Sequence, residues 1–134
     1  MAYGDTQYGG TVFALAAAIP ITLAGTVSKG DAVGYSSGWV RAFGGVAGVI
    51  QGRLVALQSG VLGDIIMAAF MAEVGGRFSE MTPGDPLYVS EEDAGQYEEV
   101  APNTTDDATT IVGYAITADE ALIRLTETDS LAPA

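Results

Sequence analysis

The sequence predicts an all-β fold, a small β-barrel or sandwich made of short hairpins joined by Gly-Asp turns, with at most one short helix. A turn–strand–turn–strand pattern occurs twice, in residues 26–40 and again in residues 82–97. Each copy runs from Gly-Asp into a short apolar segment with an aromatic residue, and then reaches a second glycine before another aromatic residue. A further Gly-Asp pair precedes the apolar run of residues 65–74, so turn signals and short apolar runs alternate along the chain.

The Gly-Asp pairs are predicted to be structural turns. Glycine adopts the positive φ angle that such a turn needs, and the aspartate side chain accepts a hydrogen bond from nearby backbone. The turn residues expected from this pattern are Gly30, Asp31, Gly63, Asp64, Gly84 and Asp85.

The length of 134 residues favours a single domain. Residues 1–20 are expected to form a flexible N-terminal arm, residues 21–127 the β domain, and residues 128–134 a loose C-terminal tail. Tyr3 and Tyr8 lie in the arm. There they either anchor a neighbouring molecule through their large contact area or belong to a disordered terminus.

Most of the remaining chain alternates between turn residues and short apolar runs. Residues 11–25 fit either a helix, because they are rich in alanine, or a strand that follows Pro20. Residues 65–74 are apolar on both faces and predict a central strand, with a helix as the competing interpretation. Residues 44–52 carry four glycines and suit a loop or an edge strand where another backbone comes close. The predicted strands are 21–24, 33–35, 39–43, 53–57, 65–74, 87–90, 97–101, 111–117 and 121–126.

The residue types that are missing restrict the possible chemistry. The chain has no cysteine and no histidine, which removes thiolate nucleophiles, the common general base and nearly all zinc sites. Carboxylate, lysine, tyrosine and serine chemistry remain available. No phosphate loop, dinucleotide fingerprint or nucleophile elbow is present. We therefore expect a protein that is not an enzyme and that carries no metal and no cofactor.

The charge of the chain bears on its partners. Seventeen acidic and five basic residues give a formal net charge of −12, which disfavours nucleic acid and anionic membrane surfaces. The first half is nearly uncharged and the second half is acidic, which suggests one solvated face and one face that meets another protein. Residues 12–19 are too short to span a membrane, and no basic residue precedes them as in a signal peptide, so we expect synthesis in the cytoplasm.

Individual charged and aromatic residues give weaker indications. The acidic clusters lack the alternating spacing of a calcium loop and are best explained as a solvated face, although a carboxylate pair for glycoside hydrolysis stays open. Trp39 is expected in the core rather than on a ligand platform. The basic residues are spread singly and are candidates for ion pairs: Lys29, Arg41, Arg53, Arg77 and Arg124.

Four segments together resemble a known family. They are Lys-Gly-Asp-Ala-Val at 29–33, Gly-Asp-Pro-Leu-Tyr-Val at 84–89, Ile-Val-Gly-Tyr-Ala at 111–115 and Leu-Ile-Arg-Leu at 122–125. The chain resembles the small head-decoration, or capsid cement, proteins of tailed bacteriophages over roughly residues 20–126. Those proteins are short, acidic, mostly β and rich in glycine, alanine, threonine and valine.

The resemblance implies a structural virion protein on the outer surface of the phage head, made in the host cytoplasm. It implies the major capsid protein as partner, self-association as a homotrimer, and no binding of nucleic acid or membrane. The N-terminal arm is then expected to contact the capsid through Tyr3, Tyr8, Val12 and Phe13. Two alternatives stay open: a tail or fibre domain that binds host surface glycan, for which Trp39 and Tyr97 are the candidate aromatic residues, and a small carboxylate-dependent hydrolase.

Overall fold

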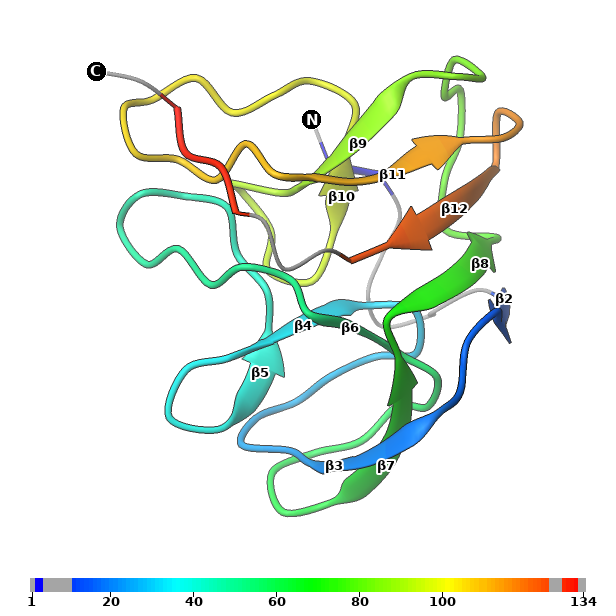
Figure 1. Ribbon diagram of the computed structural model, residues 1–134, viewed down its shortest axis with the longest axis vertical. Helices are drawn as coiled ribbons and strands as arrows, with labels where there is room; N and C mark the ends of the chain where they lie inside the picture. The colour runs from blue at the N-terminus through cyan, green and yellow to red at the C-terminus, as the bar shows by residue number, and fades with distance from the viewer. Residues whose placement is uncertain (1, 4–10, 126–128, 133–134) are drawn as a thin grey trace.

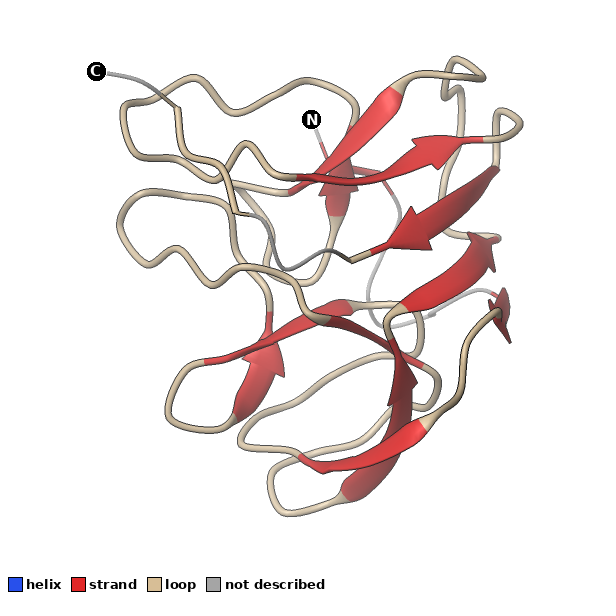
Figure 2. Ribbon diagram, in the orientation of Figure 1, coloured by secondary structure: helices blue, strands red, loops and turns tan. Residues whose placement is uncertain are grey.

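The computed structural model describes residues 2–3, 11–125 and 129–132. The fold is all-β, with two antiparallel sheets in a sandwich arrangement that does not close into a barrel (Figures 1 and 2). None of the described residues is in a helix. In this part of the chain there is accordingly no helix long and apolar enough to cross a membrane.

The larger sheet has seven strands in the order β1-β10-β9-β11-β12-β8-β2. Some neighbouring strands of this sheet form consecutive hairpins and others come from distant parts of the chain, and the described strands pair antiparallel throughout. The strands are β1 (Ala2–Tyr3), β2 (Thr11–Ala14), β8 (Met71–Gly75), β9 (Pro86–Val89), β10 (Tyr97–Glu98), β11 (Ile111–Ala115) and β12 (Glu120–Arg124).

The smaller sheet has five strands in the order β3-β7-β6-β4-β5. The β4–β5 hairpin pairs Tyr35 with Trp39 across the turn at Ser36-Ser37-Gly38. The strands are β3 (Ile19–Thr22), β4 (Ala32–Tyr35), β5 (Trp39–Arg41), β6 (Leu54–Ala56) and β7 (Ile65–Ala69).

The apolar run of residues 65–74 is not one central strand. It forms β7 in the smaller sheet and β8 in the larger sheet, and Phe70 lies at the junction (Figure 1). The carbonyl of Phe70 accepts a hydrogen bond from the N–H of Leu125 at 2.8 Å, which ties the corner to the end of β12. A segment that passes from one sheet to the other contributes to the packing of both, and this accounts for its apolar character on both faces.

Residues 1–20 do not form a separate arm where the structure describes them. β1 pairs with β10, β2 pairs with β8, and β3 begins at Ile19. The expected division at residue 20 is therefore wrong, because residues 11–14 belong to the larger sheet and β3 of the smaller sheet begins at Ile19. The ambiguous residues 11–25 contain strands, because β8 and β7 offer them backbone partners that an isolated helix would lack.

The interior is divided into two apolar clusters, one for each sheet region. Tyr97 lies in the larger cluster with its ring fully buried, and its hydroxyl donates to the carbonyl of Gly30 at 2.8 Å. This hydrogen bond joins the two copies of the repeated sequence pattern, because Gly30 belongs to the first and Tyr97 to the second. Further members of the larger cluster are Val74, Leu87, Val89, Val112 and Ile123, and the smaller one contains Ile21, Leu23, Val33, Leu54 and Ile66.

The three Gly-Asp turns share one backbone conformation. Gly30, Gly63 and Gly84 have φ angles of 92°, 91° and 90°. In each turn the aspartate N–H donates to the carbonyl three residues earlier, at 3.0, 3.0 and 3.1 Å respectively. Positive φ at this position is accessible to glycine without the strain that a Cβ brings.

The aspartate side chains of these turns differ. The carboxylate of Asp31 accepts the N–H of Ser28, and that of Asp64 accepts the N–H of Val61, both at 2.9 Å. In the third turn the N–H of Thr82 donates instead to Oε2 of Glu99 at 2.8 Å. Loss of solvation and the neighbouring Glu99 carboxylate raise the pKa of Asp85. Asp85 therefore makes the same backbone hydrogen bond as the other two aspartates, while Glu99 replaces its side chain as the acceptor for the first residue of the turn.

Candidate docking surface

The outer face of the seven-stranded sheet is the main candidate for a functional surface. In β8 and β12, Ala72, Val74, Ala121 and Ile123 are buried, so the alternate residues of these strands point outward. The register aligns Phe13 with Glu73, Glu73 with Leu122, and Leu122 with Tyr114. One outward row thus crosses four strands, which are β2, β8 and the β12–β11 hairpin, from three separate parts of the sequence.

This outer face is apolar and exposed. The exposed fractions are 68% for Phe13, 49% for Leu15, 42% for Ile111 and 50% for Tyr114. Such a concentration of exposed apolar side chains on one sheet face is typical of a surface that meets another molecule. The other apolar side chains at alternate, outward positions are Met71, Tyr88 and Leu122.

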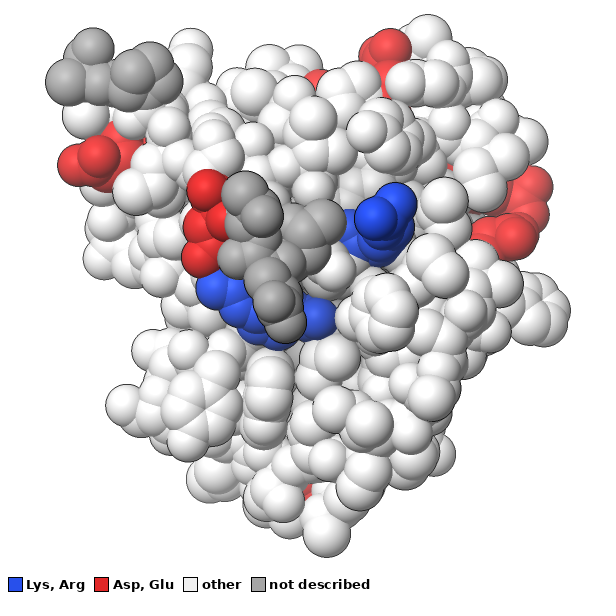
Figure 3. Space-filling view, viewed as in Figure 1, with Lys and Arg blue, Asp and Glu red and all other residues white. Residues whose placement is uncertain are grey.

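The same face is nearly free of the negative charge that dominates the chain. Within β2, β8, β9, β11 and β12 the charged residues are Glu73, Glu120 and Arg124. The chain as a whole has a formal net charge of −12. Figure 3 shows mostly uncharged surface over β8, β11 and β12, with acidic groups toward the edge of the view.

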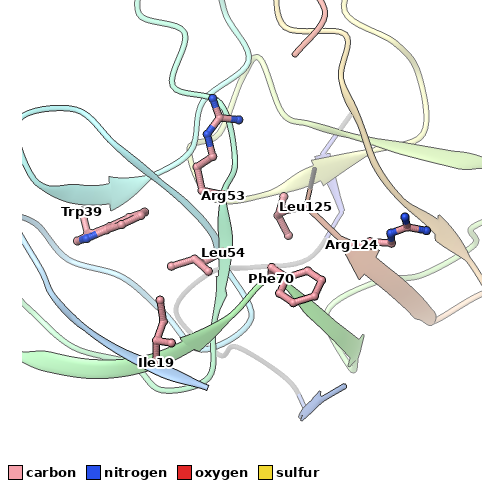
Figure 4. Close-up of a pocket in the computed structure, with 7 residues that line it drawn as sticks. All are labelled: Ile19, Trp39, Arg53, Leu54, Phe70, Arg124 and Leu125. Carbon is pink, nitrogen blue, oxygen red and sulfur yellow. The ribbon is translucent and has the colours of Figure 1, made fainter. Parts of the chain in front are cut away.

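A groove of about 560 Å³ adjoins this face where the two sheets diverge. Figure 4 shows apolar side chains at its centre and two arginines directed away from that centre. Phe70, the residue at the β7–β8 corner, is 48% exposed in it. The lining residues are Ile19, Trp39, Arg53, Leu54, Phe70, Arg124 and Leu125.

The two arginines of the groove have different surroundings. Arg53 donates from Nη1 and Nη2 to the two carboxylate oxygens of Asp129, at 2.6 and 2.7 Å. This bidentate pair lowers the pKa of Asp129. Arg124 also lines a second hollow, of about 230 Å³, with Ile111, Gly113 and Tyr114, and so stands between the groove and the sheet face. The ion pairs found among the described residues do not include Arg124.

An ionic network lies behind the surface and joins the turn at Asp31 to Arg41 and to Arg77, which follows β8. Asp31 is fully buried and accepts hydrogen bonds from Nη2 of Arg77 at 2.7 Å and from Nε of Arg41 at 2.8 Å. Burial raises the pKa of Asp31, while the two guanidinium groups oppose that shift. The guanidinium of Arg77 lies 6.0 Å from the centre of the Tyr97 ring. Asp31 and Arg77 are excluded from solvent and Arg41 is partly exposed, so the network supports the fold from within.

A carboxyl pair occurs where residues 102–110 meet the loop at residue 46. Asp107 accepts the N–H of Val46 at 2.7 Å and the N–H of Thr104 at 3.1 Å. A hydrogen bond between the side chains of Glu91 and Asp107, together with partial burial, raises the pKa of Glu91 to about 7 and lowers that of Asp107. Neither carboxyl lines the groove, and Asp107 is occupied by two loop N–H groups, so the pair joins loops.

The predicted contact residues are found in different places. Phe13 points outward on β2, whereas the half-buried Val12 packs against the larger core cluster. Tyr3 is in β1, where its backbone pairs with Tyr97, and Tyr8 lies outside the described residues. The structure thus brings Phe13 to the outer face and assigns Val12 to the core.

The candidate aromatic residues for glycan binding are also separated. Tyr97 is buried in the core and does not share a surface with Trp39. Trp39 is half-buried and packs against the smaller core cluster, and its ring also forms an edge-to-face pair with that of Tyr35 at 5.4 Å between centroids. Tyr35 itself is 66% exposed.

Sequence reasoning missed Tyr114, Leu122 and Arg124 as members of one surface. The alternation within residues 111–117 and 121–126 was a usable signal, because it assigns these residues to the side opposite the buried ones. It does not indicate that β2 and β8 extend the same face, since that depends on pairing between distant strands.

Comparison of this chain with known protein families, with curated proteins and with solved structures finds no match. Among the described residues, no acidic side chains are grouped so that they would hold a metal ion. The described residues thus form a small all-β protein, and its main candidate for a functional surface is the exposed apolar face of the larger sheet.

Proposed function

We propose that this protein is a structural virion protein that binds the outer surface of the assembled phage head and stabilises it as a decoration, or cement, protein. The proposed partner is the major capsid protein, and the outer face of the seven-stranded sheet is the proposed contact. The observation that carries the proposal is the outward row of Phe13, Leu122 and Tyr114 in a very acidic chain. Glu73 is the acidic residue within this row.

The physical basis is the burial of apolar surface with few charged groups, which in these strands are Glu73, Glu120 and Arg124. Each Å² of apolar surface removed from water contributes about 25 cal/mol, whereas burying an unpaired carboxylate is strongly unfavourable. Most of the acidic residues lie outside the strands of this face and stay in solvent when it docks. Many copies that bind the assembled shell, and not its free subunits, shift the equilibrium toward the shell.

Co-sedimentation with heads of the parent phage tests this proposal. The purified protein is mixed with expanded heads and, separately, with unexpanded proheads, and the pelleted fraction is measured against protein concentration. We expect saturable pelleting with expanded heads. The saturation level gives the copy number per lattice site.

A charge placed on the proposed face makes the test specific. Tyr114→Glu introduces a carboxylate in the centre of the face, and we expect it to abolish saturable pelleting. Leu62→Glu is the matched control, because Leu62 is 72% exposed in the turn before β7 of the smaller sheet and is not on a strand of the face. Equal pelleting of both variants would exclude this face as the contact, and no pelleting of the native chain would exclude the function.

The exposed Tyr35–Trp39 pair favours a second candidate, a tail or fibre domain that binds host surface glycan. Sugar rings stack on exposed aromatic faces, and this pair lies beside the groove that Trp39 lines. Failure to pellet with either kind of head, together with binding to host-cell glycan that Trp39→Ala abolishes, would favour this alternative.

A further inference from the structure

Strand β2 forms an open edge of the larger sheet. Residues Thr11–Ala14 pair with β8, and Leu15 continues the ladder through a hydrogen bond from its N–H to the carbonyl of Met71 at 3.0 Å. No other described strand pairs with β2. Natural edge strands are commonly blocked by proline or charge, as β3 is by Pro20, but β2 contains neither.

The hydrogen-bond pattern shows which groups of β2 face the open side. Because Leu15 bonds to β8, the alternation of an antiparallel ladder makes Phe13 and Thr11 the other residues that bond to β8. Val12 and Ala14 therefore direct their N–H and C=O groups away from β8, toward the open edge. The edge thus offers two donors and two acceptors in the regular spacing of a strand.

Charge indicates what this edge can pair with. Residues 6–28 contain no charged side chain, in a chain whose formal net charge is −12. Two copies of such a chain repel each other through their acidic residues, and β2 itself adds no charge to that repulsion, although Glu73 lies opposite Phe13 on β8. A second copy also carries a strand of identical length and spacing, which an antiparallel two-fold arrangement requires.

We propose that two copies of this protein pair antiparallel through β2, with Phe13 on the two-fold axis. Val12 then lies opposite the partner's Ala14, and each such pair exchanges two backbone hydrogen bonds, so that all four outward-facing groups of each β2 are satisfied. Phe13 lies opposite the partner's Phe13 in a non-hydrogen-bonded pair, where Cα atoms are about 4.5 Å apart and the side chains are closest.

This pairing accounts for exposed apolar groups that a monomer leaves in water. Phe13 is 68% exposed, and cross-strand aromatic pairs are among the contacts that stabilise sheets. Leu15, 49% exposed, comes opposite the partner's Thr11. The two larger sheets become continuous, and their outer apolar faces lie on the same side of the joined sheet.

The inference goes beyond the proposed function and does not depend on it, because it concerns the purified protein alone. It also differs from the homotrimer that the family resemblance implies. A two-fold contact places the same patch on both copies, whereas a closed three-fold ring cannot pair β2 with β2 in every subunit.

Cysteine cross-linking tests the predicted register directly, because the chain has no cysteine of its own. In Phe13→Cys the Cα atoms of the two new cysteines are expected about 4.5 Å apart. This lies within the range of about 4.4–6.8 Å between the Cα atoms of disulfide-bonded cysteines. Leu62→Cys is the control, since Leu62 is 72% exposed and is not on β2. Under mild oxidation, we expect disulfide-linked dimers of Phe13→Cys to form at least about tenfold faster than those of Leu62→Cys.

A second pair of variants leaves Phe13 in place. Ala14→Pro removes one N–H from the open edge, a position where an edge strand tolerates proline, while Ala14→Thr keeps that donor. Sedimentation analysis is expected to give a dimer for the native chain and for Ala14→Thr, and a monomer for Ala14→Pro. Circular dichroism checks that the monomer keeps its sheet content.

Each result supports or overturns the pairing. A native chain that sediments as a monomer or a trimer would overturn it. Cross-linking of Phe13→Cys no faster than that of Leu62→Cys would overturn the register, and a dimer of folded Ala14→Pro as stable as the native one would overturn the role of the open edge.

Discussion

Nη2 of Arg77 donates a hydrogen bond of 2.7 Å to the carboxylate of Asp31, and both side chains are almost completely excluded from water. The pair joins a turn of the first repeated segment to a residue just after β8. Arg41 adds a second guanidinium to the same carboxylate at 2.8 Å. Because the charges are buried, the energetic consequence of removing one of them is much larger than for a surface pair.

Substitution of the buried aspartate is therefore expected to be severe. In Asp31→Asn the buried guanidinium of Arg77 loses its counter-charge, and the partly exposed Arg41 loses its ion pair. Removing one partner of a buried pair typically costs about 3–5 kcal/mol. Chemical denaturation measures this loss as a lower free energy of unfolding. Asp64→Asn is the control, because Asp64 makes the equivalent turn but is exposed and accepts only the N–H of Val61. Similar losses in both variants would contradict the role of the ionic network.

Gly95 is expected to tolerate no side chain because of the same network. It has a φ angle of 83°, and a Cβ built on it would lie 2.8 Å from Cγ of Asp31. Gly63 has a φ angle of 91° but open space around its Cβ position. Gly63→Ala should cost about 1–2 kcal/mol of unfolding free energy from backbone strain alone, and Gly95→Ala clearly more. Equal losses in the two variants would show that the contact with Asp31 does not matter.

The hydroxyl of Tyr97 is expected to contribute to stability without any role in packing. Tyr97→Phe keeps the buried ring and removes the 2.8 Å hydrogen bond to the carbonyl of Gly30. Leaving that buried carbonyl without its donor should cost about 1–3 kcal/mol. The free energy of unfolding measures the loss, and Tyr35→Phe, at an exposed tyrosine, provides a control that should change little. An unchanged Tyr97→Phe would mean that Gly30 finds another donor.

The Glu91–Asp107 pair makes stability depend on pH near neutrality. The hydrogen bond to Asp107 raises the pKa of Glu91 from 4.5 to about 7, so between these values the folded state holds a proton that the unfolded state has released. The stabilisation is complete below pH 4.5 and is lost progressively as the pH rises through about 7. The lowered pKa of Asp107 acts in the opposite sense, and only at more acidic pH.

Thermal unfolding followed between about pH 5 and about pH 8 checks this expectation. The unfolding temperature of the native chain should fall as the pH rises. In Glu91→Gln the amide can still donate to Asp107 but does not titrate, so the fall should be much smaller. A native chain and a Glu91→Gln variant with parallel profiles would assign the pH dependence to other groups.

Several features of the structure were accessible from the sequence because they depend on neighbouring residues. The alternation of short apolar runs with turn residues predicted the all-β fold, and the structure confirms it. The β4–β5 hairpin and the β11–β12 hairpin occur within the segments expected for them. Local backbone preferences and side-chain period are sufficient for such elements, since a hairpin pairs residues that are close in the chain.

By itself the sequence determined the all-β class, the strong negative charge and the lack of histidine and cysteine chemistry. Only the tertiary structure decided that residues 65–74 bend at Phe70 between two sheets, that residues 11–14 join β8, and that Asp31 meets Arg77 in the core. The physical reason is the same in each case. These outcomes depend on contacts between segments distant in the chain, whose energies come from burial and pairing that no local pattern encodes.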